Sequence, residues 1–121
     1  MPATIVQPTL QSASHLRTPE IRLLRDLARR VTELYPGSVL TLFGSRARGD
    51  AGEDSDWDVL VELARPLQAE ERIALLDEVY DFMLERDFAL EIQIVPVDPG
   101  DRSRYGGLLR QVASEGLRIV C

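Results

Sequence analysis

The chain contains no lysine and no asparagine, and it has a single cysteine, Cys121, and a single histidine, His15. One of each is too few for an internal disulfide or a zinc cluster. His15 falls in a polar segment before the first expected helix, where we expect a surface residue rather than half of a Ser-His or Cys-His catalytic pair. This excludes most hydrolase mechanisms.

Long apolar runs are also absent. Every apolar run is far shorter than the roughly 20 residues that a membrane helix needs, and the first residues lack the basic and then apolar pattern of a secretory signal. We therefore expect no membrane contact and a cytoplasmic location. The net charge of −6 argues against strong nucleic-acid binding, because that affinity comes from neutralising phosphates.

The length of 121 residues fits one domain. Pro2, Pro8 and several small polar residues indicate that residues 1–17 form a flexible arm, which leaves residues 18–121 as the single domain. An exposed edge at the last expected strand could pair with a second copy, so the oligomeric state stays open.

The order of the expected elements is typical of a layered α/β or α+β fold. Apolar residues at helical spacing predict helices over residues 18–34 and 68–86, and a last helix from residue 101 or 103 to residue 115. Apolar and alternating segments predict strands near residues 38–43, 57–63, 89–96 and 117–120. We expect a small mixed β-sheet with helices on one face and the other face open for a site.

In the two longer helices, one apolar stripe is expected to pack on the sheet as core. The stripe of the first helix consists of Ile21, Leu24, Leu27, Ala28, Val31 and Leu34. The stripe of the second consists of Ile73, Leu76, Val79, Tyr80 and Met83.

The most informative segment is residues 43–61, in which two aspartates flank Trp57 at the start of an apolar run. Successive side chains of a strand point to opposite faces, so Asp56 and Asp58 should lie on one face about 6.5 to 7 Å apart. Two carboxylates this close repel each other unless a cation lies between them or the site stays wet. Mg²⁺ suits the pair, since it takes oxygen ligands and is often held by one or two carboxylates together with substrate phosphates.

A Gly-Ser turn precedes the aspartates, between the strand that ends at Phe43 and one short helical turn. Gly44 lets a phosphate approach the backbone, Ser45 adds a hydroxyl, and the free N–H groups of a helix start favour an anion. Arg46 and Arg48 can add guanidinium groups for a triphosphate. The lysine of a P-loop is missing, so a Walker-type interpretation fails.

A non-functional alternative is that the Asp, Gly and Ser residues form only a solvated turn on an unrelated α/β domain. Asp58 argues against it, because this residue lies inside the apolar segment from Trp57 to Leu63, where an unpaired charge is costly to bury. The residue types alone are compatible with both interpretations.

The segment of residues 42–61 resembles the signature of the minimal nucleotidyltransferase family, within the polymerase-beta-like nucleotidyltransferase superfamily. That signature is a hydrophobic residue, Gly-Gly or Gly-Ser, and then Asp-x-Asp on the next strand. The resemblance implies a nucleotidyltransferase fold. It also implies that the pair Gly44 and Ser45 binds the nucleotide phosphates and that the pair Asp56 and Asp58 binds divalent metal.

Two further positions follow from the resemblance. Arg48 falls where family members commonly carry a basic residue, which implies nucleotide binding. The family has a third carboxylate on a later strand, and Glu91 in the alternating segment 89–97 is the natural match. Glu91 would then complete the metal site or act as the base for the incoming hydroxyl. It could instead be a solvent-facing residue of an edge strand or a partner for an arginine.

The resemblance implies a metal-dependent nucleotidyltransferase. It would transfer a nucleoside monophosphate, AMP from ATP, to an acceptor hydroxyl and release pyrophosphate, with Mg²⁺ or Mn²⁺ held by Asp56, Asp58 and Glu91. Members of this family are often encoded beside a helical HEPN-domain protein in a toxin–antitoxin pair, so a HEPN-type partner is implied. The alternative function is a catalytically weak protein that neutralises such a partner by contact.

Overall fold

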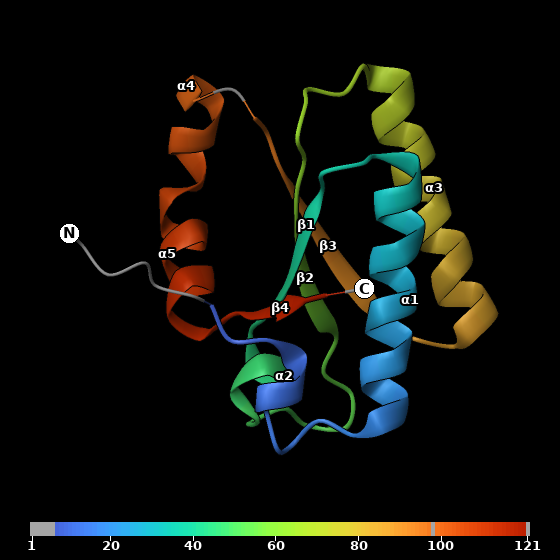
Figure 1. Cartoon of the computed structure of the whole chain (residues 1–121), viewed down its shortest axis with the longest axis vertical. Coiled ribbons are helices and arrows are strands. Elements are labelled where there is room, and N and C mark those ends of the chain that lie inside the picture. Colours follow the sequence, from blue (N-terminus) through green and yellow to red (C-terminus); the bar gives the residue numbers. More distant parts are fainter. Residues whose placement is uncertain (1–6, 98, 121) are drawn as a thin grey trace.

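A four-stranded sheet forms the centre of the computed structural model, which describes residues 7–97 and 99–120 (Figure 1). The strands are β1 (Val39–Phe43), β2 (Trp57–Glu62), β3 (Leu90–Val95) and β4 (Leu117–Ile119). Their order is β3-β2-β1-β4, with β1 antiparallel to β2 and β4, and with β2 parallel to β3. The predicted small mixed sheet is therefore confirmed.

Helices lie on both sides of this sheet (Figure 1). The long helices are α1 (Thr18–Leu34), α3 (Ala69–Arg86) and α5 (Gly106–Glu115). The short pieces are η1 (Leu10–Ser12), α2 (Ser45–Arg48), α4 (Pro99–Arg102) and η2 (Ser103–Tyr105). The expected last helix is thus divided into α4, η2 and α5, and Gly106 and Gly107 are the first two residues of α5. In the parts of the chain that the structure describes, no helix has the length and apolar content to cross a membrane.

The larger core lies between the sheet and the pair α1 and α3. Trp57, Val59 and Val61 of β2 point to this side and are at most 5% exposed. Leu24 of α1 and Phe82 of α3 are fully buried in the same cluster, and each such side chain contributes about 1.5–3 kcal/mol to folding. Because side chains alternate along a strand, the even-numbered positions of β2 turn to the opposite face.

Helix α5 covers part of that opposite face. A second cluster joins Phe43 and Leu60 of the sheet to Val112 of α5, and Leu108 and Leu109 pack against it. We predicted helices on one face only, and the structure adds α5 on the other, because positions 108, 109 and 112 form an apolar stripe at helical spacing. Helix α5 therefore covers part of the sheet face that was expected to be open for the site.

The predicted apolar stripe of α3 is partly wrong. Ile73, Leu76 and Tyr80 are 60%, 41% and 58% exposed, while Leu75 and Phe82 are fully buried in their place. Apolar residues lie around much of the circumference of α3, so their spacing alone allowed more than one choice of buried face.

The described part of the predicted arm, residues 7–17, lies against the domain. Leu10 is 1% exposed and belongs to the larger core. The N–H of Arg118 in β4 donates to the carbonyl oxygen of Pro8 at 2.7 Å, and Thr9 forms a bridge with the same arginine. In this part of the arm, the apolar side chain of Leu10 and the backbone of Pro8 thus find partners in the domain. Residues 1–6 of the arm lie outside the described residues.

Candidate active site

Asp58 and Glu91 are register partners across the parallel strands β2 and β3. Partners in neighbouring strands place their side chains on the same face of a sheet, which here is the face that α5 partly covers. Asp58 is half-buried and Glu91 is exposed. The sheet thus brings together two carboxylates that are 33 positions apart in the chain, at 58 and 91.

The pKa of Asp58 is raised above its ordinary value, mainly by burial. The negative charge of Glu91, a side-chain hydrogen bond with Glu91 and the charge of Asp56 act in the same direction, whereas Arg48 opposes them. Asp56 itself lies just before β2 and is exposed. The charges of Asp56 and Glu91 therefore both act on the carboxylate of Asp58.

Gly44 lies directly against the Asp58 carboxylate. β1 ends at Phe43, and the chain passes through Gly44 with a φ of +76° before α2 begins at Ser45. A β-carbon built on Gly44 would overlap Oδ2 of Asp58, so only glycine permits both this backbone conformation and this approach. Ser45 is half-buried at the first position of α2. The predicted phosphate turn and the predicted metal ligand are thus neighbours in space.

Glu115 is a residue of this site that the sequence analysis missed. Its Oε2 accepts a hydrogen bond from the backbone N–H of Gly44 at 2.5 Å and another from Nη1 of Arg48 at 2.8 Å. Arg48 also donates to Asp50 at 3.1 Å. Glu115 lies 71 positions after Gly44, and no local pattern reports a contact of that range. In the sequence, Glu115 stands directly before Gly116, and this position predicts only the end of a helix.

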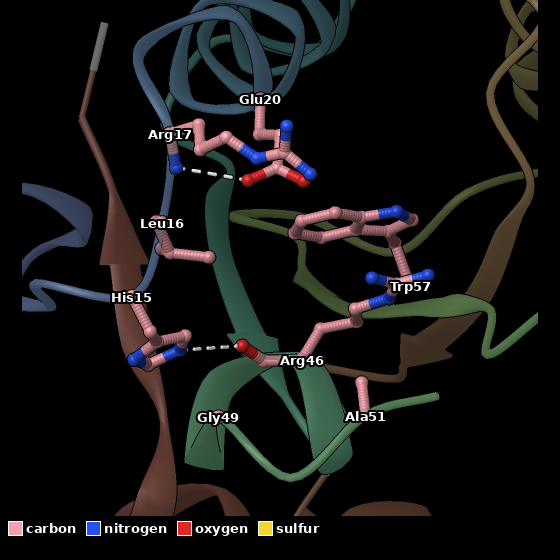
Figure 2. A pocket seen from close by; sticks show the side chains of 8 residues that line it. All are labelled: His15, Leu16, Arg17, Glu20, Arg46, Gly49, Ala51 and Trp57. Atoms are coloured by element: carbon pink, nitrogen blue, oxygen red, sulfur yellow. Dashed lines mark hydrogen bonds between the residues drawn. The ribbon is translucent and has the colours of Figure 1, made fainter. Parts of the chain in front are cut away.

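Arg46 does not join the predicted phosphate-binding groups. Its guanidinium lies over the ring of Trp57, 4.7 Å from the centroid, and donates to the carbonyl oxygens of Glu53 and Ser55 at 2.8–3.1 Å. Figure 2 shows this side chain extended along Trp57 in a pocket that His15 also lines. Nε2 of His15 forms a hydrogen bond of 2.8 Å with the carbonyl oxygen of Arg46. Arg46 therefore holds the loop between α2 and β2.

The donor set of the site suits a hard cation. Within the described residues, no group of three or more His, Cys, Asp or Glu side chains is gathered closely enough to form a complete metal cluster. Mg²⁺ does not require one, since it usually keeps several waters and takes one or two carboxylates together with substrate phosphates. The pKa of Asp58 is raised first by burial and then by the negative charge of Glu91, and a cation between the two carboxylates would offset both effects. The residues present therefore fit Mg²⁺ or Mn²⁺.

Solved structures with this fold include three complexes of toxins and antitoxins. A chain of a toxin–antitoxin complex with AMP-PNP is 21% identical, with a TM-score of 0.57, over 79% of this chain and 72% of that chain. A chain of the MntA–HpeT complex, with two aspartates changed to glutamate, is 19% identical, with a TM-score of 0.59, over 80% and 72%. A chain of a tri-AMPylated Shewanella oneidensis HEPN toxin in complex with MNT antitoxin is 20% identical, with a TM-score of 0.54, over 83% and 71%.

At these identities the three structures show a common fold. No curated protein matches the chain. The family model of the nucleotidyltransferase domain, however, matches residues 24–119, which include the Gly-Ser turn, all three predicted carboxylates and Glu115. The match takes in every strand of the sheet and most of the chain. The protein therefore belongs to the nucleotidyltransferase domain family.

Proposed function

We propose that the chain transfers AMP from ATP to an acceptor hydroxyl, in a reaction that depends on a divalent metal. The observation that carries the proposal is the approach of the Asp58 carboxylate to the Gly44 turn, with Glu91 beside it. A turn that favours anions, placed against acidic side chains, suits a phosphate and a cation bound together. Membership of the nucleotidyltransferase domain family supports the same reaction class.

Each residue of the site has a role in this reaction. The turn Gly44–Ser45 and Arg48 bind the triphosphate through the N–H groups of the helix start, a hydroxyl and a guanidinium. Asp56, Asp58 and Glu91 would hold Mg²⁺ or Mn²⁺. When bound, the metal would neutralise charge on the phosphates and on the leaving pyrophosphate.

The reaction is an in-line displacement. The acceptor oxygen forms a bond to the α-phosphorus while the bond from that phosphorus to the oxygen bridging the α- and β-phosphates breaks, and pyrophosphate leaves with that oxygen. Glu91 is exposed on this face, so in the alternative role in which it does not hold the metal it would take the proton of the acceptor hydroxyl and pass it to water. With Glu91 on the metal, the proton passes directly to water. Positioning and electrostatic stabilisation supply most of the rate enhancement.

We further propose that the acceptor belongs to a HEPN-type partner, so that the chain acts as a cytoplasmic antitoxin. The support comes from proteins of the same fold: one complex holds AMP-PNP, and another contains a HEPN toxin carrying three AMP groups. In the third, the two mutated aspartates are two positions apart, as Asp56 and Asp58 are here.

A second candidate function is neutralisation of the partner by contact, with little or no transfer. One observation favours it: the Gly44 N–H and the Arg48 guanidinium, both proposed to bind phosphate, already have Glu115 as a partner. Weak nucleotide binding would follow if that contact persisted.

Incubation with radiolabelled ATP, Mg²⁺ and a HEPN-domain partner tests the two functions. Transfer predicts label on the partner with the wild-type chain and a loss of at least about 100-fold with Asp58→Asn, which removes one charge from the site. Asp77→Asn, an exposed aspartate on α3, is the matched control and should transfer normally. If the wild type neutralises the partner without placing label on it, and Asp58→Asn neutralises it equally well, the contact function holds and the transfer proposal is wrong.

A further inference from the structure

Two hydrogen-bond donors of the proposed nucleotide site converge on one oxygen atom. Oε2 of Glu115 receives the Gly44 N–H and the Arg48 Nη1–H together. The side chain of Glu115 is 16% exposed, so this carboxylate lies within the site rather than free in solvent. A phosphate oxygen bound by the turn would seek the same two donors.

Helix electrostatics do not explain an acidic residue at this place. Glu115 is the last residue of α5, and a negative charge at the C-terminal end of a helix is disfavoured, because the free carbonyl groups there carry partial negative charge. The contacts with Gly44 and Arg48 compensate for this position. The reason for a carboxylate at 115 therefore lies across the site and not in α5.

The backbone directly after Glu115 is hydrogen-bonded and closely packed. The N–H of Gly116 donates to the carbonyl of Val112 at 2.7 Å, and the side-chain amide of Gln7 donates to the same carbonyl at 2.8 Å. A β-carbon at Gly116 would also overlap a methyl group of Thr41, so the chain has no room to shift here. Release of the two donors would therefore occur by rotation of the Glu115 side chain rather than by a shift of its backbone.

We propose that Glu115 is an internal anion that occupies the phosphate position of the Gly44 turn and is displaced when nucleotide binds. The proposal rests on the nucleotide-binding part of the proposed function and adds a residue that sets its affinity. Without nucleotide, Glu115 balances Arg48 and holds the turn in shape. With nucleotide, a phosphate oxygen takes its place, and the carboxylate moves to solvent because it would otherwise repel the phosphate.

Nucleotide affinity tests this displacement directly. Titration calorimetry with AMP-PNP and Mg²⁺ compares the wild type with Glu115→Gln, which keeps the shape of the side chain and removes its charge. We expect Kd to fall by about tenfold, because phosphate no longer competes with a charge-assisted hydrogen bond. In turnover assays the same variant should lower KM, with kcat changed less. Glu33→Gln, an exposed glutamate in the last turn of α1, is the matched control and should bind as the wild type does.

A purely structural role for Glu115 predicts the opposite sign. If the carboxylate only holds the turn, Glu115→Gln will bind AMP-PNP with unchanged or weaker affinity, and that result would overturn the proposal. Arg48→Ala provides a second check, since it removes one of the two shared donors. In that background the gain from Glu115→Gln should be clearly smaller than in the wild type, and an undiminished gain would also contradict the displacement.

Tripolyphosphate separates this inference from the proposed transfer reaction. If labelled AMP reaches the partner but Glu115→Gln does not tighten binding of AMP-PNP or tripolyphosphate, displacement is wrong and transfer stands. If no label is transferred but Glu115→Gln binds tripolyphosphate more tightly, transfer is wrong and displacement stands. Should neither probe bind to the variant, displacement is overturned. Thermal unfolding of each variant verifies that it is folded.

Discussion

The carboxylate of Asp58 fills the space that a β-carbon on Gly44 would need. The two residues come from different strand ends, since Gly44 follows β1 and Asp58 belongs to β2, and Asp58 is paired with Phe43 in the sheet. The phosphate turn and the acidic site are therefore one structural unit, and a substitution of either residue should change the position of the other.

Gly44→Ala should abolish nucleotide transfer and reduce stability. A side chain at a φ of +76° strains the backbone by about 1–3 kcal/mol, and the new methyl group would push the Asp58 carboxylate away. Urea denaturation measures the loss of stability, and the labelled-ATP assay measures the activity. Gly52→Ala is the control, because a β-carbon there meets only the Ser55 hydroxyl at 3.9 Å. Equal effects of the two substitutions would contradict this account of the turn.

Asp58→Asn should stabilise the protein at neutral pH while it removes activity. The pKa of Asp58 is raised in the folded protein, so the folded state binds this proton more tightly than the unfolded chain does. Protonated Asp58 therefore favours the folded state. This stabilisation is complete below the ordinary aspartate pKa of about 3.9, and it is lost as the pH rises through the raised pKa of the folded protein. In thermal unfolding, the Tm of the variant should exceed that of the wild type at pH 7, and the difference in Tm should shrink towards pH 3. A difference independent of pH would show that charge is not its cause.

Mg²⁺ should stabilise the wild type against heat, since binding to the folded state alone raises its stability. The increase in Tm should be reversed by EDTA and should be absent from the double variant Asp58→Asn/Glu91→Gln, which retains the shape of the pair without its charge. Asp77→Asn again serves as the control on α3. An equal increase in Tm for the double variant would place the binding of Mg²⁺ elsewhere.

The two neighbouring arginines should behave differently. Arg46→Ala should change the fluorescence emission of Trp57, the only tryptophan, because the guanidinium lies over its ring, and should cost about 1–3 kcal/mol through the lost loop hydrogen bonds. Arg48→Ala should leave the emission spectrum unchanged and weaken nucleotide binding. Fluorescence spectra and AMP-PNP titrations of both variants test this division, which fails if Arg48→Ala shifts the emission or Arg46→Ala alone loses affinity.

The sequence was informative where a feature depends on neighbouring residues. The Gly-Ser turn, the short helix after it and the strand carrying Asp58 each have local signals, and all three elements are present. The buried face of α3 was harder to predict, because both faces carry apolar residues and only packing on the sheet selects Phe82 over Tyr80. Glu115 could not be assigned from spacing, since its partners Gly44 and Arg48 lie 71 and 67 positions earlier in the chain.

The parallel pairing of β2 and β3 limits where residues can be inserted into this chain without disrupting the site. Side chains alternate along a strand, so a slip of one residue would place Leu90 or Ile92, instead of Glu91, beside Asp58. The connection from α3 to β3 is only residues 87–89, so an inserted residue that does not lengthen this turn would shift β3 along β2. A shift of one residue would invert the faces of β3, exposing Leu90 and Ile92 and turning Glu91 towards the larger core. Relatives that keep the acidic pair should therefore carry their insertions elsewhere, such as in the longer segment between α2 and β2.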